Sequence, residues 1–219
     1  MKKYFELLRK CSLFGGVEDE NLISMLGCLG VRVKVYDKKE AIVSEGDSAG
    51  EIGILLSGSA QIEQTDYFGN SSIVASIEPS ELFGEAFACA GVKHYPVDVV
   101  ATDAAEVMFV DCSRVLETCS NSCSFHRQII YNLVRVVARK NIMFHQKIGI
   151  TSKRTTREKL MAYLNLQAKK AGACSFDIPY DRQELADYRE VYRSGLSAEI
   201  SKLRKEGVLR SEKNRFTLL

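Results

Sequence analysis

The spacing of hydrophobic and polar residues changes twice along the chain. Residues 17–27 have apolar side chains at helical spacing behind acidic residues, which predicts a helix. From residue 31 the period becomes two, because Val31, Val33 and Val35 alternate with polar residues as in a half-buried strand. From about residue 122 the spacing is helical again.

Further short apolar runs follow the first strand at close spacing, with glycine or proline between several of them. We expect strands at Ile52–Leu56, Ala60–Gln64, Ser72–Ile77, Val97–Ala101 and Val107–Val110. Several short strands separated by turns are typical of a sandwich or barrel. The sequence therefore predicts a β domain that ends near residue 121.

A long helix is predicted over residues 122–148, which contain no glycine or proline. Its apolar positions form two adjacent stripes: Ile130, Leu133, Val137 and Phe144, and then Ile129, Val136 and Met143. This apolar arc is wider than a single contact needs. Two interpretations follow. The helix packs on the β domain with one side and on a second copy of itself with the other, or it is a core helix of a monomer.

The tail predicts a winged helix-turn-helix. A helix is expected over residues 155–169, followed by a short strand at 175–179. Asp181 can cap the next helix, with Glu184 as its capping-box partner. The last helix, at about 193–206, ends at a glycine and is followed by a hairpin.

Charge is distributed unevenly, although the net charge is only +2. Residues 1–150 carry 15 Lys and Arg and 19 Asp and Glu, whereas residues 151–219 carry 15 and 9. A basic tail on an acidic body favours a polyanionic partner, or otherwise a solvated basic face. No apolar run of about 18 residues occurs, so we expect no membrane partner and a cytoplasmic location.

The last helix can enter the major groove of DNA, since that groove admits an α-helix. Arg193 can form a bidentate contact with guanine, and the serines can contact bases or phosphates. The candidate DNA-binding residues are Arg182, Arg193, Ser194, Ser197, Ser201 and Lys202. The alternative is a winged helix that serves protein contacts.

Taken together, the chain resembles the Crp/Fnr family of bacterial transcription regulators over nearly its whole length. The motifs that carry the resemblance are Glu45-Gly46-Asp47, Ile54–Gly58, Leu82-Phe83-Gly84-Glu85, Val107–Asp111, Asp181–Ala186 and Arg193. The resemblance implies an α+β chain with a cyclic-nucleotide-type β-roll sensor (1–121), a dimerisation helix and hinge (122–150) and a winged helix-turn-helix DNA-binding domain (151–219). It implies a homodimer that binds a near-palindromic operator in double-stranded DNA in response to a small-molecule effector, with RNA polymerase as a candidate further partner.

The sequence departs from the cyclic-AMP-binding members of that family. In those members a Gly-Glu pair begins a phosphate-binding helix and an Arg-Ser pair follows it. Here Gly84 and Glu85 are present, but Tyr95-Pro96 stands at the Arg-Ser position, and proline has no N–H to donate. We therefore expect an effector other than cyclic AMP, or an empty pocket. The candidate pocket residues are Gly84, Glu85, His94, Tyr95, Pro96, Phe144 and His145.

Other members of the family sense through haem or iron–sulfur clusters. Cys119, Cys123 and His126 are candidate metal ligands at helical spacing, but only Cys11 stands where a cluster-binding member has a close cysteine group. The alternative is that the seven cysteines of the chain are buried and structural. The identity of any cofactor is left open by the sequence. No catalytic or nucleotide-binding motif occurs, so an enzyme is not expected.

A regulator that has lost specific DNA binding is the competing hypothesis. Its basis is Arg189-Glu190, at a turn that often carries glycine, and Ala198, at a position where many relatives carry arginine. Such a chain would act as a sensor or interaction module.

Overall fold

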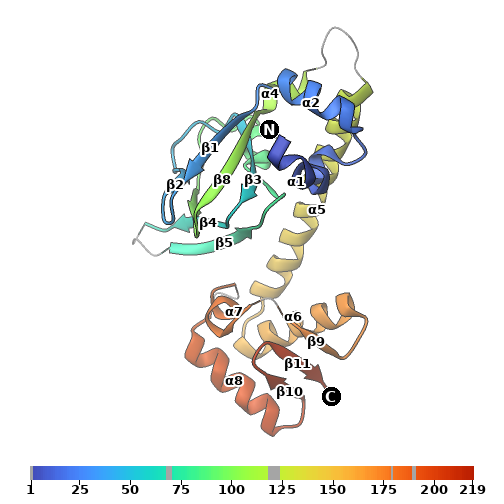
Figure 1. Cartoon of the computed structure of the whole chain (residues 1–219). Helices are drawn as coiled ribbons and strands as arrows, with labels where there is room; N and C mark the ends of the chain where they lie inside the picture. The colour runs from blue at the N-terminus through green and yellow to red at the C-terminus, as the bar shows by residue number, and fades with distance from the viewer. Residues whose placement is uncertain (1, 68–70, 118–123, 179, 189–190) are drawn as a thin grey trace. The chain divides into compact units, whose positions relative to one another are not determined.

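A computed structural model describes residues 2–67, 71–117, 124–178, 180–188 and 191–219. The chain forms two compact units, residues 1–140 and 141–219, and each is described by itself. The first combines a β-roll with short helices, and the second is a winged helix-turn-helix (Figure 1). The predicted α+β fold is confirmed.

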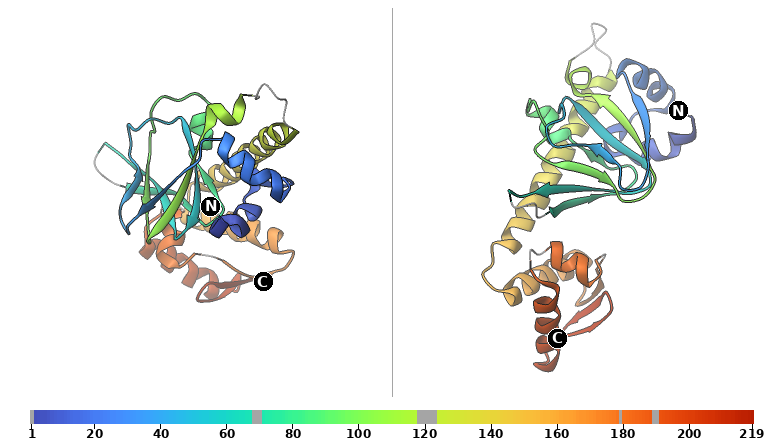
Figure 2. Two further views of the ribbon diagram at one scale, coloured as in Figure 1. Left: turned by 45° about the horizontal axis from the view of Figure 1, so that its top comes forward. Right: turned by 90° about the vertical axis from the view of Figure 1, so that its left-hand side faces the viewer.

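Two four-stranded antiparallel sheets make up the β-roll. The first runs in the order β1 (Arg32–Tyr36), β8 (Ala105–Asp111), β3 (Glu51–Ser57) and β6 (Leu82–Phe83). The second runs in the order β2 (Ala41–Val43), β7 (Asp98–Ala101), β4 (Ala60–Thr65) and β5 (Ser71–Ile77). Leu55, Val107 and Val99 of the two sheets share one core. Figure 2 shows the strands of the β-roll from two further sides.

Helices cover the other face of the first sheet. They are η1 (Lys2–Tyr4), α1 (Phe5–Lys10), η2 (Ser12–Phe14), α2 (Asp19–Cys28), α4 (Cys112–Leu116) and the first part of α5 (Ser124–Thr151). The middle five residues of β3 are therefore buried on both faces. A Cβ atom at Gly53 would lie 2.1 Å from the Phe83 ring, so only glycine lets that ring approach the strand.

The strand β1 differs from its prediction in burial. It forms as expected, but Val33 and Val35 are 36% and 70% exposed instead of half-buried. The strand lies at the edge of its sheet, and the helical layer that packs on β3 and β8 includes only Val31 from this region. The alternation of apolar and polar residues thus identified the strand but did not predict how far its valines are buried.

The second unit contains α6 (Thr156–Ala171), α7 (Arg182–Tyr188) and α8 (Arg193–Lys205). A three-stranded sheet joins them, in the order β10 (Leu209–Glu212), β11 (Arg215–Leu218) and β9 (Ser175–Asp177). The predicted capping box is confirmed, since the N–H groups of Glu184 and Asp181 donate to each other's carboxylates at 2.8 Å. Of the helices in the described residues, none has the length and apolar character that crossing a bilayer needs.

Candidate functional site

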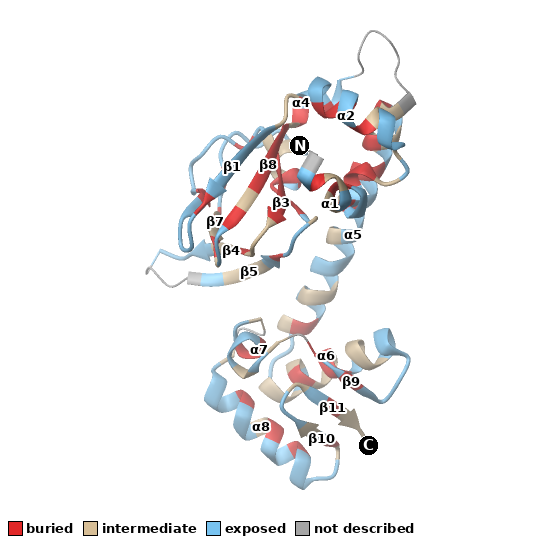
Figure 3. Ribbon diagram, viewed as in Figure 1, coloured by how far each residue is buried: buried red, intermediate tan, exposed pale blue. Residues whose placement is uncertain are grey.

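The helix α8 presents one polar face to solvent. Leu196, Ile200 and Leu203 point into the core of the second unit and are almost fully buried. The opposite face carries Ser194, Ser197, Ala198, Ser201, Lys202 and Lys205, all of them exposed (Figure 3). A helix fixed by one apolar stripe, with small and basic side chains opposite, can lie against a groove of DNA without rearranging.

An ion-pair cluster holds α8 against α6. Arg157 donates to the carboxylate of Glu206, the residue just after α8, at 2.7 Å. It also lies 3.6 Å from the carboxylate of Glu199, which is within α8. The guanidinium lowers the pKa of Glu206 below its ordinary value through this hydrogen bond. The contact secures the C-terminal end of α8, while Arg193 at the other end is exposed.

Two of the candidate DNA-binding residues have internal partners. Arg182 lies over the ring of Phe216, 5.0 Å from its centroid, and burial lowers the pKa of this guanidinium. The hydroxyl of Ser201 donates to the carbonyl of Ser197 at 2.9 Å. The structure thus brings Ser194, Ser197, Ser201 and Lys202 onto one face and leaves Arg182 packed beside the sheet.

A basic cavity lies at the β10–β11 hairpin. It measures about 520 Å³, and Arg204, Arg210 and Arg215 contribute to its lining. Arg210 is not among the DNA-binding residues predicted from the sequence. The signal was available, because Arg210 is the polar residue next to buried Leu209 in a hairpin strand and therefore points outward.

Tyr95 lies directly against Gly84, the residue that precedes the helix expected to bind a nucleotide phosphate. Gly84 has a φ of +76° and precedes α3 (Glu85–Cys89). A Cβ atom at Gly84 would lie 2.3 Å from the Tyr95 hydroxyl, which donates to the carbonyl of Glu51 at 2.9 Å. Burial raises the pKa of Tyr95 to about 12, so its hydroxyl is protonated and uncharged at neutral pH.

Glu85, the acidic residue of the same motif, has an internal partner. Its Oε1 atom lies 2.9 Å from Nζ of Lys140 on α5, and this ammonium also donates to the carbonyl of Leu82. Glu85 is only 3% exposed, and its Oε2 atom has no hydrogen-bond partner among the residues that the structure describes. The carboxylate thus joins α3 to α5.

The remaining candidates for the effector pocket belong to both units. Nδ1 of His94 lies 2.8 Å from the carbonyl of Gly46, and Pro96 is exposed. Phe144 and His145 are exposed on the part of α5 that belongs to the second unit. Within the first unit, the structure thus brings Gly84, Glu85 and Tyr95 together, while the His94 ring bonds to Gly46.

The metal candidates are only partly described. Cys119 and Cys123 lie outside the described residues, while Nε2 of His126 lies 3.2 Å from the carbonyl of Arg114. Across the described ranges, no three His, Cys, Asp or Glu side chains are grouped as metal ligands.

Two further thiols lie close together. Sγ of Cys89 and Sγ of Cys112 are 3.8 Å apart, and burial raises the pKa of Cys112 to about 12. Burial raises the pKa of Cys89 as well, so neither thiol is activated as a nucleophile at neutral pH.

An apolar stripe runs along the outer side of α5. Ile129, Asn132, Leu133 and Val136 face the core of the first unit. Residues on the opposite side are exposed, and they include Tyr131, Val134, Ala138 and Ile142. Large apolar side chains aligned on one helix face are typical of an interface rather than of scattered surface positions.

Two protein-family models match the chain. The model of the cyclic nucleotide-binding domain matches residues 33–122, and that of the Crp-like helix-turn-helix domain matches residues 158–219. Together they span the strands of the β-roll apart from Arg32, most of α6, and all of α7, α8 and the strands β9 to β11.

Similar proteins include two transcriptional activators. FnrL of Cereibacter sphaeroides is 22% identical over 199 residues, which are 84% of this chain and 75% of that protein. FnrA of Stutzerimonas stutzeri is 24% identical over 193 residues, 86% of this chain and 77% of that protein. Among solved structures, the c-di-GMP-responsive global regulator CLP of Xanthomonas campestris has a similar fold, with a TM-score of 0.66 and 18% identity over 91% of this chain and 99% of that one.

Proposed function

The chain belongs to the Crp/Fnr family of DNA-binding transcription regulators, and we propose that it binds a near-palindromic DNA site as a homodimer under the control of an effector other than cyclic AMP. The relatives that match most of the chain are transcriptional activators and not enzymes. The observation that carries the proposal is the outward face of α8, where exposed serines and lysines lie opposite a fully packed apolar stripe.

The division of labour on DNA follows from side-chain chemistry. Arg193, at the start of α8, offers a planar guanidinium to guanine, and Ser194 and Ser197 offer short hydroxyls to base edges. Lys202 and the hairpin residue Arg210 carry charge that suits phosphates. We assign sequence preference to the first group and overall affinity to the second.

The homodimer is supported by the exposed stripe on α5. Tyr131, Val134, Ala138 and Ile142 repeat at spacings of three and four, as in the contact face of a coiled coil. A second copy of the same helix satisfies this face, and a two-fold dimer matches a palindromic site.

Exclusion of cyclic AMP is supported by the surroundings of Gly84. A cyclic phosphate needs a cation and N–H donors. Tyr95 supplies no positive charge and its hydroxyl lies against Gly84, while Glu85 is held by Lys140. In equilibrium dialysis with cyclic AMP, cyclic GMP and c-di-GMP, we expect no saturable binding of cyclic AMP. The third nucleotide is included because CLP responds to it.

DNA binding can be tested by selection from a random pool of DNA duplexes. We expect enrichment of an inverted repeat with half-sites about one helical turn apart. Binding measured by fluorescence anisotropy should weaken as salt rises, because counterions are released on binding. Arg193→Ala should relax the preference at one position, whereas Lys202→Ala should weaken all sequences alike.

The control is Lys38→Ala, an exposed lysine of the β-roll, which should leave both properties unchanged. A pool that shows no enrichment, together with salt-independent binding, would refute the DNA-binding proposal and favour an interaction module. A visible absorption band of haem or an iron–sulfur cluster in the purified protein would favour the redox-sensing alternative.

A further inference from the structure

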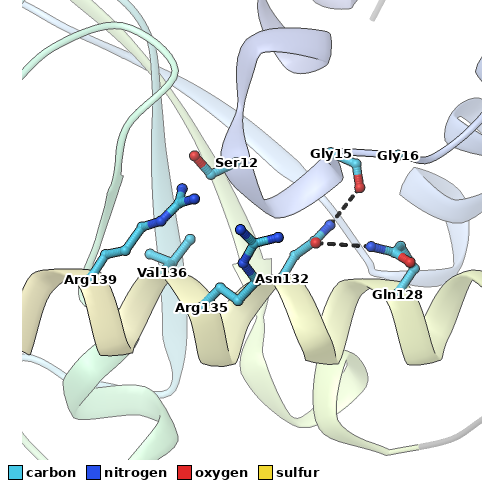
Figure 4. A pocket seen from close by; sticks show the side chains of 8 residues that line it. All are labelled: Ser12, Gly15, Gly16, Gln128, Asn132, Arg135, Val136 and Arg139. Carbon is cyan, nitrogen blue, oxygen red and sulfur yellow. Dashed lines mark hydrogen bonds between the residues drawn. The ribbon is translucent and has the colours of Figure 1, made fainter.

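A second cavity lies between α5 and the loop that follows η2. It measures about 360 Å³, which is within the range of small-molecule sites, roughly 300–1,000 Å³. Its lining comes from Ser12, Gly15 and Gly16 on one side and from Gln128, Asn132, Arg135 and Arg139 of α5 on the other (Figure 4). The residues around Gly84 do not contribute to it.

The cavity carries two positive charges without a counter-charge. Arg135 and Arg139 are one helical turn apart and both are exposed. Neither forms an ion pair with any acidic side chain that the structure describes. Like charges at this spacing repel each other and destabilise a helix slightly. An anion between them would remove that repulsion.

The guanidinium groups are directed toward the cavity. Figure 4 shows both side chains rising from α5 on the side that carries Ser12. Arg135 also lies over the ring of Tyr131, 5.6 Å from its centroid, and this contact limits its freedom.

The wall between the two sides is fixed by a buried amide. Asn132 is 6% exposed, and its Nδ2 atom donates to the carbonyls of Leu13 and Gly15 at 2.9 and 2.7 Å. Its Oδ1 atom accepts from Gln128 at 3.0 Å. These bonds hold the loop to α5 before any ligand arrives, so little ordering is needed on binding.

We propose that this cavity is a binding site for a small molecule with a phosphoryl group, held by Arg135, Arg139 and the hydroxyl of Ser12. A phosphoryl group carries up to two negative charges and has three terminal oxygens, which matches two guanidinium groups and one hydroxyl. A carboxylate offers one charge and two oxygens and would leave one donor unused. The proposal does not depend on DNA binding, and it places an effector outside the nucleotide site of the fold.

The test is isothermal titration of the full chain with inorganic pyrophosphate and, separately, with adenosine 5′-diphosphate, at constant ionic strength in chloride. We expect saturable binding of one molecule per chain for at least one of the two. Tighter binding of the diphosphate ester would indicate an organic ligand, and tighter binding of pyrophosphate would indicate the free anion.

The decisive variant is Arg135→Gln/Arg139→Gln, whose affinity should fall at least about tenfold, since each lost charge-assisted bond weakens binding substantially. Lys10→Gln/Lys38→Gln removes the same charge from exposed positions outside the cavity and should bind within about twofold of the parent. Without ligand, the two double variants should have the same circular dichroism spectrum and the same thermal midpoint.

Three results would overturn the proposal. The parent chain shows no saturable binding of either compound, or the arginine variant binds as tightly as the parent. The third result is a native mass of the arginine variant that differs from that of the parent, which would make these residues part of a contact between chains. The first two results do not bear on the DNA selection described above, so the two proposals fail separately.

Discussion

At the scale of single residues, the ion pair between Glu85 and Lys140 contributes to the stability of the first unit. Glu85 is almost fully buried, whereas the Lys140 side chain is about one-third exposed. Removing the partner of a buried charge is costly, because the remaining charge keeps its desolvation penalty.

We predict that Lys140→Met lowers the free energy of unfolding by about 2 kcal/mol, less than for a fully buried pair because water reaches the ammonium. Urea denaturation measures the change. The double variant Glu85→Gln/Lys140→Met should recover most of the loss, since no buried charge remains. Equal stabilities of Lys140→Met and the parent would show that Glu85 has another partner.

Buried thiols give a pH dependence at the same scale. Burial raises the pKa of Cys11 from an ordinary 9.0 to about 11, and that of Cys112 to about 12. Below pH 9 both thiols are protonated in the folded and unfolded states, so their contribution is fully present. Between pH 9 and 11 the unfolded chain loses these protons first, and the contribution declines.

We therefore predict that urea midpoints, measured under reducing conditions, fall as pH rises from 8 to 10.5. Cys11→Ala should show a shallower fall than the parent, whatever its stability at neutral pH, because one raised pKa is absent. Cys28→Ala removes an exposed thiol and should keep the parent's slope. A Cys11→Ala slope equal to that of the parent would contradict this assignment.

At the scale of elements, the helices of the second unit are defined by their ends. Thr155 caps α6, since its hydroxyl accepts from the N–H of Glu158 and the Glu158 carboxylate accepts from the N–H of Thr155, both at 3.1 Å. These bonds lower the pKa of Glu158. The helix ends at Gly172, whose φ is +63°.

Thr155→Ala is predicted to destabilise the protein by about 1 kcal/mol, because the N–H of Glu158 loses its acceptor and the capping box at the start of α6 is broken. Thermal unfolding detects the change. Ser152→Ala, three residues earlier and exposed, should change the midpoint little. If both variants unfold at the same temperature, the cap contributes nothing measurable.

Local signals in the sequence were sufficient for most elements. The capping box at Asp181, the glycine after α8 and the runs that became β3, β4 and β8 could each be read from neighbouring residues. The helix α1 and strand β2 were not predicted, since three to six residues carry too little periodicity. Their formation depends on contacts with distant residues.

The candidate site was less predictable than the fold. Residues on α8 could be placed on one face from helical spacing alone. In contrast, the partners of Glu85 and Tyr95 lie 55 and 44 residues away, at Lys140 and Glu51, and no local pattern indicates them. Arg135 and Arg139 also had no assigned role, because their shared cavity exists only once the loop after η2 packs on α5.

At the scale of the whole molecule, the exposed stripe on α5 determines the predicted assembly. Tyr131, Val134 and Ile142 are each more than half exposed in the single chain. Burial of such side chains against a second copy would supply the association energy, at roughly 25 cal/mol per Å² of apolar surface.

Val134→Glu/Ile142→Glu is predicted to convert the proposed dimer to a monomer at micromolar concentration, because like charges would face each other across the interface. Native mass spectrometry or sedimentation measures the state. Ile23→Glu/Val35→Glu places the same charges at exposed apolar positions off α5 and should leave the mass unchanged. A parent chain that is already monomeric would refute the interface.

The hydrogen bond of the Tyr95 hydroxyl limits how the protein could be redesigned to bind a cyclic nucleotide. Exchanging Tyr95-Pro96 for Arg-Ser would add a guanidinium and an N–H, but the carbonyl of Glu51 would lose its donor and Glu85 would still be held by Lys140. A cyclic-nucleotide responder would therefore require exchanges at three positions at least. Adding nucleotide control to this scaffold thus takes coordinated substitutions, because no single exchange removes both the contact of Tyr95 with Glu51 and that of Lys140 with Glu85.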